Sequence, residues 1–261
     1  AGRVFRSFEG VDSLFGFFGS LGRSTGKEGA NSIECLVNVY SGEPDDIDVG
    51  FWNIEWFAKR YQEKLDAVAT LVADLNLDIW ALSESSPDAA RALVTKLEER
   101  FGLKYECAFS EPGAAAGKQS TTVLWNTATV KGERRDWPSE IDGWFRVRSE
   151  QFQGLDLEAV HGKIFDRYPG LFYFETKHAQ NGLGFHVVPL HLKAMDEGSL
   201  RRRMASKILA SAVKKMVAAG GDEDWVIGGD FNAEMATGEF QDLGGSLFPV
   251  SGEDEGQGAL T

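Results

Sequence analysis

The chain has 261 residues, a formal net charge of −13 at pH 7 and a hydrophobic content of 43%. That content can fill a sizeable core, and no apolar run approaches the roughly 20 residues of a membrane span, so we expect a globular protein without stable membrane insertion. The charge argues against a broad basic surface for nucleic acid, because such binding depends on many Lys and Arg contacts to phosphates. It does not exclude a hydrolase that meets a polyanion through a divalent cation.

Cysteine usage and the start of the chain leave the compartment open. Cys35 and Cys107 are too few for a disulfide framework or a structural zinc site, although one bridge between them stays possible. The chain begins "AGRVFRSF", without a methionine. Both a cytoplasmic and a secreted protein fit these observations, and the oligomeric state is equally open.

Residues 1–46 differ in composition from the rest. They are rich in Gly and Phe, and apolar residues recur there at spacings of three and four from Val4 to Phe18. This spacing predicts one amphipathic helical face. We interpret residues 1–46 as an N-terminal extension whose phenylalanines pack on the main domain, with a membrane-surface or partner-binding helix as the alternative.

From residue 47 onward, strands and helices alternate. Residues 131–163 contain two Trp and many charges, and we expect a long irregular surface excursion there. The expected elements are strands at 47–54, "LDIWALSE", "KYECAF" and "STTVLWN", helices at 59–75, 88–101 and 199–219, paired strands "LFYFETKH" and "LGFHVVPLHL" around Asn181 and Gly182, and the strand "WVIGG". This order predicts one α/β layered domain, residues 47–261, with a mixed sheet.

Polar side chains recur where apolar strands end, which is where rigid scaffolds usually present reactive groups. They are Asn53, Glu84, His191, Asp230 and Asn232. Carboxylates, carboxamides and an imidazole make an oxygen-rich site that suits Mg²⁺ or Mn²⁺ rather than zinc. Each residue alone also has a structural explanation, as a turn residue, a solvated carboxylate or a hydrogen-bonded core histidine. Their combination favours a site.

The segment "GGDFNA" places two of these residues two positions apart. An extended backbone would direct Asp230 and Asn232 to one face and Phe231 to the other, into the core. We therefore expect Asp230 and Asn232 to act in the same site.

The ordered segments "WNIEWF", "DIWALSE", "TTVLWN", "DRYPG", "VVPLHLKA" and "WVIGGDFNAE" resemble the endonuclease/exonuclease/phosphatase superfamily over about residues 47–261. This superfamily includes pancreatic-type deoxyribonuclease, apurinic endonucleases, sphingomyelinases and inositol polyphosphate phosphatases. Ser83 stands where a glutamine usually precedes the metal-binding glutamate. The resemblance implies a four-layered α/β sandwich in which two central mixed β-sheets are flanked by helices, with the site at one end of the sheets.

The resemblance also implies roles for the site residues. Glu84 looks like the principal metal ligand, and Asn53 like a neighbour that orients metal or phosphate. Asp230 would orient or deprotonate the attacking water and contribute to the metal site, and Asn232 would hold a phosphate oxygen. His191 falls where deoxyribonuclease-like members have a phosphate-contacting or acid histidine. A sixth residue, Arg167 in "DRYPG", matches an arginine that contacts substrate phosphate.

Three further features are interpreted as structural. "GAAAGKQS" departs from a phosphate-binding loop in its glycine spacing, in the glutamine after Lys118 and in preceding a strand. "RRRM" at 201–204 is interpreted mainly as a solvated helix face, although one of its arginines can help at the site. His161, His178 and His186 match no ligand spacing.

The family's late Asp-His pair has no counterpart in this sequence. Only 29 residues follow Asn232, and none is a histidine. We expect that the given chain stops before that segment, because an open inner sheet edge would cost burial, rather than that the enzyme is degenerate. If these residues are the whole protein, we expect metal binding with severely impaired hydrolysis.

The sequence therefore predicts a Mg²⁺- or Mn²⁺-dependent phosphodiester hydrolase and, among such enzymes, an endonuclease with DNA as its substrate. A phosphomonoesterase or a lipid phosphodiesterase, of the inositol phosphate or sphingomyelin type, is the alternative within the superfamily. A catalytically silent phosphate-binding module is the alternative from another class. The sequence does not distinguish base or lesion preference.

Overall fold

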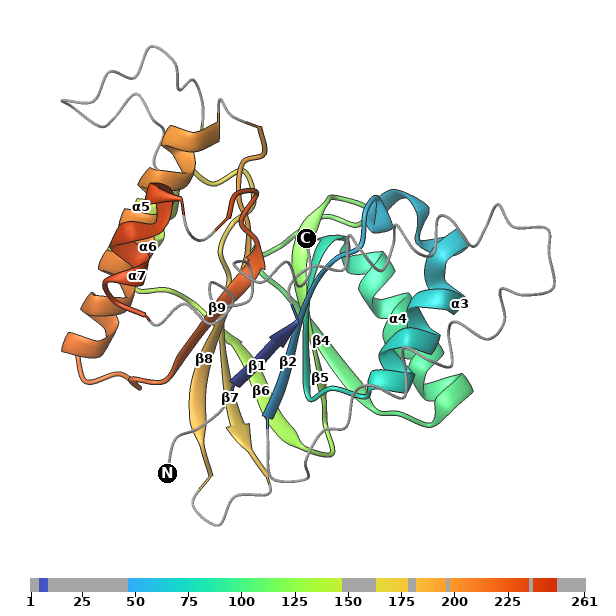
Figure 1. Cartoon of the computed structure of the whole chain (residues 1–261). Helices are drawn as coiled ribbons and strands as arrows, with labels where there is room; N and C mark the ends of the chain where they lie inside the picture. The colour runs from blue at the N-terminus through green and yellow to red at the C-terminus, as the bar shows by residue number, and fades with distance from the viewer. Residues whose placement is uncertain are drawn as a thin grey trace.

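Two β-sheets face each other in the centre of the molecule, and helices cover both outer faces (Figure 1). The computed structural model describes residues 5–8, 47–146, 163–177, 182–195, 198–234 and 237–247. These layers, helix, sheet, sheet and helix, confirm the predicted four-layered α/β sandwich.

The first sheet has five strands in the order β1-β2-β3-β5-β4. The β1-β2 and β2-β3 pairs are parallel, and β5 is antiparallel to both of its neighbours, so the sheet is mixed as predicted. Its strands are β1 (Phe5–Phe8), β2 (Ile47–Asn53), β3 (Ile79–Ser85), β4 (Tyr105–Phe109) and β5 (Ser120–Asn126).

The second sheet has four strands in the order β6-β7-β8-β9. The first two pairs are antiparallel, whereas β8 and β9 are parallel and are connected through the long helix α6. Its strands are β6 (Val130–Arg135), β7 (Leu171–Thr176), β8 (Gly184–His191) and β9 (Trp225–Asp230).

Helices α3 (Phe57–Leu75) and α4 (Pro87–Phe101) cover the first sheet. Helix α4 is capped at its N-terminus by Ser86, whose side chain accepts the Ala89 N–H, and at its C-terminus by Gly102 in the left-handed conformation. Over the second sheet lie α5 (Ser139–Arg146), α6 (Ser199–Ala218), the 3₁₀ helix η3 (Gly238–Phe240) and α7 (Gln241–Gly244).

Apolar side chains from both sheets fill the space between them. At one point the sheets approach so closely that only glycine fits, because a Cβ on Gly228 of β9 would lie 2.5 Å from the Phe51 ring of β2. This contact brings the ends of β2 and β9 together. The core between the sheets contains Val49, Phe51, Ile79, Ala81, Val123, Trp125, Val130, Phe172, Phe174, Phe185 and Val187.

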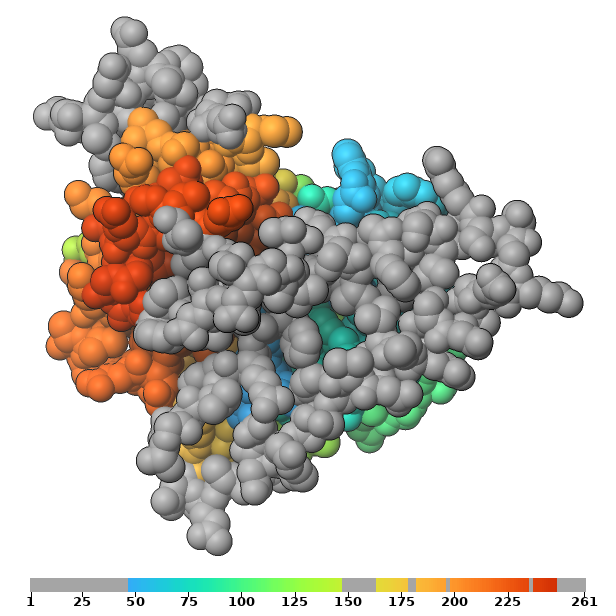
Figure 2. Space-filling view, viewed as in Figure 1, coloured from blue at the N-terminus to red at the C-terminus, as the bar shows by residue number. Residues whose placement is uncertain are grey.

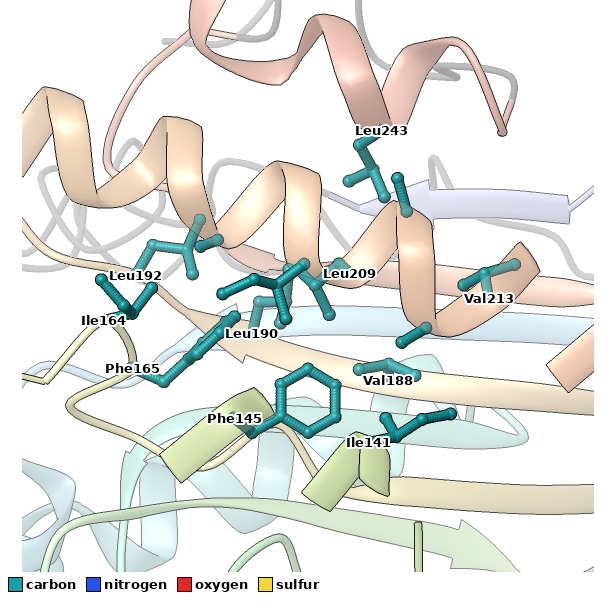
Figure 3. Close-up of a cluster of buried hydrophobic side chains, with 14 of the residues drawn as sticks. Ile141, Phe145, Ile164, Phe165, Val188, Leu190, Leu192, Leu209, Val213 and Leu243 are labelled. Carbon is teal, nitrogen blue, oxygen red and sulfur yellow. The ribbon is translucent and has the colours of Figure 1, made fainter. Parts of the chain in front are cut away.

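The helical layers have cores of their own. Val188 and Leu190 of β8 pack against Leu209 and Val213 of α6, with Phe145 of α5 beside them (Figure 3). Each such fully buried side chain contributes roughly 1.5–3 kcal/mol relative to exposure. Space-filling spheres show the orange and red residues of α6, β9 and α7 gathered on one side of the molecule (Figure 2).

Two sequence-based expectations about secondary structure were wrong. Residues 130–135 form β6, and α5 follows within the stretch expected to be irregular. In the edge strand β6, charged residues alternate with residues that face inward. In the short helix α5, Ile141 and Phe145 form the buried side. The many charged residues of this stretch therefore concealed the periodicity of both elements. Residues 5–8, which belong to the helix expected near the N-terminus, instead form the strand β1. The other residues of that expected helix lie outside the described residues, and so does Asn181 of the expected turn.

None of the helices within the described residues is both long enough and apolar enough to cross a bilayer.

Candidate active site

The strand ends that carry the predicted polar residues meet at one end of the two sheets. His191, the last residue of β8, is the Cα partner of Asp230, the last residue of β9. In the facing sheet, Asn53 ends β2 and is the Cα partner of Ser83, so Glu84 follows one position later on β3. Four strands from two sheets therefore present their side chains to the same region.

Asp230 is the centre of this arrangement. Its Oδ2 accepts a hydrogen bond of 2.8 Å from Asn53 Nδ2, which joins the two sheets. Its Oδ1 accepts the Asn232 backbone N–H at 2.9 Å, and His191 Nε2 lies 3.7 Å from Oδ2. The carboxylate is thus fixed in orientation by groups from three strand ends.

Asn232 reaches the site by a turn and not by an extended backbone, contrary to the sequence-based expectation. Strand β9 ends at Asp230, and Asn232 adopts a left-handed conformation with φ 53°, which asparagine tolerates better than most residues. Its Nδ2 donates to Leu192 O at 3.1 Å. Phe231 is buried and packs on Phe240, as predicted.

The glycine before Asp230 has a structural reason. Gly229 has φ 130°, and a Cβ there would lie 2.2 Å from the Leu190 carbonyl oxygen of the neighbouring strand. Only glycine allows this backbone conformation and this close approach. Gly229 therefore sets the direction in which Asp230 leaves the sheet.

Glu84 lies at an irregularity of β3, where the register with β5 shifts between Leu82 and Ser85. Its φ is 56°, and its Oε2 accepts the Trp56 backbone N–H at 2.8 Å. The preceding residue, Ser83, is buried and donates from Oγ to Leu190 O at 3.2 Å in the facing sheet. The bulge turns Glu84 out of the strand while Ser83 ties the sheets together beneath it.

Arg167 lies in the segment between α5 and β7. Its Nη2 donates to Gln119 Oε1 at 2.8 Å, and the neighbouring Asp166 accepts from Arg201 Nη2 at 2.8 Å. The positive charge of its guanidinium lowers the pKa of the His191 imidazole. Arg167 is therefore held at the edge of the site without an ion pair to Asp230.

His191 is buried, and burial lowers its pKa, as does the nearby charge of Arg167. The carboxylates of Asp230 and Glu84 oppose this lowering of the pKa. The imidazole is therefore mainly neutral at pH 7. Its Nδ1 is buried and has no hydrogen-bond partner among the described residues.

The donor set can be tested against a hard cation. Asn53 directs its amide N–H to Asp230, and its Oδ1 is buried without a hydrogen-bond partner in the described part of the chain. A carboxamide oxygen beside two carboxylates is the ligand chemistry that Mg²⁺ accepts. The described residues contain no cluster of three or more His, Cys, Asp and Glu suited to a metal. The predicted set of Glu84, Asn53 and Asp230 combines two carboxylates with one carboxamide.

The "RRRM" segment was interpreted mainly as a solvated face, and this was wrong for two of its arginines. Arg201 and Arg202 are buried, whereas Arg203 is exposed. Arg202 Nε pairs with Glu239 at 2.5 Å, and its Nη1 donates to Lys193 O and, at 2.8 Å, to Met195 O. Arg201 thus holds the segment that carries Arg167, and Arg202 holds the segment that follows His191.

Sequence reasoning missed two residues beside the site. Gln119 holds Arg167, although its segment was interpreted as an ordinary loop, and only its position directly before β5 could have indicated this. Trp56 anchors Glu84 through its backbone, a contact that depends on local conformation and leaves no residue signature. The expected structural role of His186 agrees with its burial in a stack against Trp225.

The sequence profile described as the Endonuclease/Exonuclease/phosphatase family matches residues 50–249. This chain belongs to that family. The match confirms the resemblance that the sequence motifs indicated. Members of the family are typically hydrolases that act on phosphoester bonds, and they generally use divalent metals. A comparison with curated proteins finds no match.

Solved structures that are similar to this one include TDP2 proteins and a bacterial family member. TDP2 from C. elegans is 19% identical, with a TM-score of 0.48 and coverage of 85% of this chain and 57% of that one. Humanized D. rerio TDP2 carrying 14 mutations is 16% identical, with a TM-score of 0.46 and coverage of 76% and 66%. An endonuclease/exonuclease/phosphatase from Bacteroides vulgatus is 18% identical, with a TM-score of 0.48 and coverage of 75% and 69%. The chain spans 57% to 66% of the length of these TDP2 structures.

Proposed function

We propose that this protein hydrolyses phosphodiester bonds with the help of Mg²⁺ or Mn²⁺, and that its substrate is DNA. The observation that carries the proposal is the convergence on Asp230, which accepts from Asn53 of the facing sheet and lies beside His191 of the neighbouring strand. Family membership supports the reaction class.

Asp230 has the role of positioning the attacking water. Its carboxylate is held by Asn53 Nδ2 and the Asn232 N–H, so it does not have to reorganise when a water molecule approaches. The remaining lone pairs of the carboxylate can accept a proton from that water.

The phosphate is held by a donor set around this carboxylate. Arg167 supplies a guanidinium, whose fork of N–H groups matches phosphate oxygens. Asn232 supplies an amide, and neutral His191 supplies a ring N–H. An anionic phosphate beside His191 would raise the pKa of the ring, so the same imidazole becomes better able to protonate the leaving oxygen.

Glu84, Asn53 Oδ1 and Asp230 would hold the divalent cation. When bound, it supplies neutralisation of the charge that develops on the phosphoryl oxygens. The Trp56 N–H on Glu84 Oε2 fixes that carboxylate in advance. Asp230 thus has a part both in the metal site and in the orientation of water.

The overall charge bears on the substrate footprint. With a net charge of −13 the protein cannot rely on a broad cationic surface, so binding would depend on the cation and on a few groups such as Arg167. We therefore propose that the protein contacts a short stretch of DNA around the scissile phosphate.

The proposal is tested with the full-length protein on supercoiled plasmid and single-stranded oligonucleotides, with Mg²⁺ and with EDTA. We expect cleavage that EDTA abolishes and that Asp230→Ala reduces at least a hundredfold. Asp74→Ala, which removes an exposed aspartate of α3, is the matched control and should retain full activity.

The other substrate classes are outcomes of the same experiment. Hydrolysis of a phosphoinositide or of sphingomyelin without cleavage of DNA would replace the proposed substrate by an inositol phosphate or a lipid. Binding of these compounds without turnover of any of them would identify a silent binding module and overturn the proposed activity.

A further inference from the structure

Trp56 is unusual in exposing a large apolar side chain beside the site. In the described part of the chain, Trp56 at 47% and Met195 at 70% are the two exposed large hydrophobic residues. The next residue, Phe57, is completely buried and packs edge-on against Tyr61. The "WF" pair thus directs one aromatic ring into the core and the other into solvent.

The conformation of Trp56 is also costly. Its φ of 59° and ψ of 19° lie in the left-handed region, which bulky residues rarely adopt. The Trp56 N–H donates to Glu84 Oε2, and its carbonyl accepts from Lys59 N and Arg60 N in the first turn of α3. The backbone that presents the indole is therefore fixed to the proposed metal ligand on one side and to a helix on the other.

The indole is oriented by its neighbours. Lys59 Nζ lies 4.4 Å from the ring centroid, and the indole Nε1 donates to Glu55 Oε1 at 3.2 Å. An aromatic ring held in this way is a stacking surface for a planar ligand. The Lys59 ammonium lies over one face of the ring, where it favours an anionic ligand and disfavours a cationic head group such as choline, so a planar group would stack on the opposite face.

We propose that Trp56 is the surface on which a nucleobase of the substrate stacks, with Lys59 contacting the phosphate next to that base. The inference rests on the proposed phosphodiesterase function and narrows its substrate to nucleic acid in which a base face is open, at a strand end or in a single-stranded segment. Stacking of a base on an exposed aromatic side chain is tolerant of base identity. Trp56 therefore selects for the presence of a base and not for the identity of that base.

The test compares two substrates that differ only in their bases. One is a short oligothymidylate, and the other is an oligomer of the same length in which abasic tetrahydrofuran residues replace the nucleosides. For Trp56→Ala we expect KM on oligothymidylate to rise about tenfold or more, and KM on the abasic oligomer to rise much less. Trp56→Phe should retain most of the preference for the base-bearing oligomer.

Trp144→Ala is the matched control. Trp144 is partly buried on α5 and also has a lysine near its ring, because Lys215 Nζ lies 5.5 Å from the centroid. Lys215 belongs to the last turn of α6, the end remote from Arg201 and Arg202. This variant should leave the ratio of the two KM values unchanged.

Binding measured in EDTA separates this inference from the proposed function. Fluorescence anisotropy of labelled oligothymidylate should show an affinity about tenfold weaker for Trp56→Ala than for the wild type. Absence of cleavage by the wild type, combined with this weakening, would overturn the phosphodiesterase proposal and keep the stacking surface. Equal losses on base-bearing and abasic oligomers, or no loss on either, would overturn the stacking surface.

Discussion

Asn53 and Asp230 lie 177 residues apart in the chain and share a hydrogen bond of 2.8 Å between Asn53 Nδ2 and Asp230 Oδ2. The bond joins the ends of β2 and β9, which belong to different sheets. It also leaves Asn53 Oδ1 buried and unpaired with any described group. The candidate site thus lies across the interface of the two sheets, and its geometry depends on how closely they pack.

Replacing Asn53 by aspartate should make the protein dependent on a divalent cation for stability. A second carboxylate at hydrogen-bond distance from Asp230 would repel it, and we expect a loss of about 1–2 kcal/mol in EDTA. This corresponds to a fall in Tm of roughly 2–8 °C, which Mg²⁺ should reverse. Asn53→Ala adds no charge and serves as the control. A Tm of Asn53→Asp that does not respond to Mg²⁺ would contradict the proposed metal ligands.

Gly229 should not tolerate a side chain. Because alanine at φ 130° would place its Cβ 2.2 Å from Leu190 O, Gly229→Ala should lower the free energy of unfolding by at least about 2 kcal/mol and abolish activity. Gly244→Ala in α7 meets nothing within 4 Å and should be neutral or slightly stabilising. Urea denaturation of both variants measures the difference. Equal stabilities would show that β8 and β9 do not have the described register.

Arg202 should be essential for stability, unlike its neighbour. Arg202→Leu leaves Glu239 and two backbone carbonyls without their partner, and we expect a loss of about 3 kcal/mol. Arg203→Leu alters an exposed side chain and should change stability by less than about 0.5 kcal/mol. Chemical denaturation measures the free energy of unfolding of both variants. Equally small losses for the two would show that Arg202 is solvated and not paired.

His186 should make the protein less stable in mild acid. Burial lowers the pKa of His186 to about 4, from 6.5 in an unfolded chain. The unfolded state therefore binds more protons than the folded state between these values, and stability falls as pH decreases from 6.5 towards 4. The loss should be roughly 3 kcal/mol. His186→Phe can stack on Trp225 without titrating, and its denaturation midpoint should depend less on pH over this window. An identical pH dependence for both proteins would show that His186 is not the group responsible.

The layer order and the positions of most strands and helices were predictable because their apolar periodicity is strong. Helix α6 repeats Met204, Ile208 and Ala212 on its buried face, and β5 contains the apolar run Val123, Leu124 and Trp125. Strand β6 was missed because it lies at the edge of its sheet and exposes alternate charged residues. Such a strand carries little of the apolar signal on which sequence reasoning depends.

That the candidate residues come together at one end of the sheets was predictable from their position after strands, but their geometry was not. Asn232 was placed correctly near Asp230 for the wrong reason, since a left-handed turn and not an extended strand brings them together. The conformations of Trp56 and Glu84 likewise depend on tertiary contacts between distant segments. The buried roles of Arg201 and Arg202 arise from pairing with Asp166 and Glu239, which local patterns do not encode.

The most direct test of the account is the rate at which the full-length protein hydrolyses a single-stranded DNA oligonucleotide in Mg²⁺, compared with that of Asp230→Asn. This substitution keeps the size of the side chain and removes the charge that would orient the water and hold the cation. We predict hydrolysis by the wild type that requires Mg²⁺, and a rate at least about a hundredfold lower for Asp230→Asn. Hydrolysis that persists in EDTA, or equal rates for the two proteins, would contradict the account.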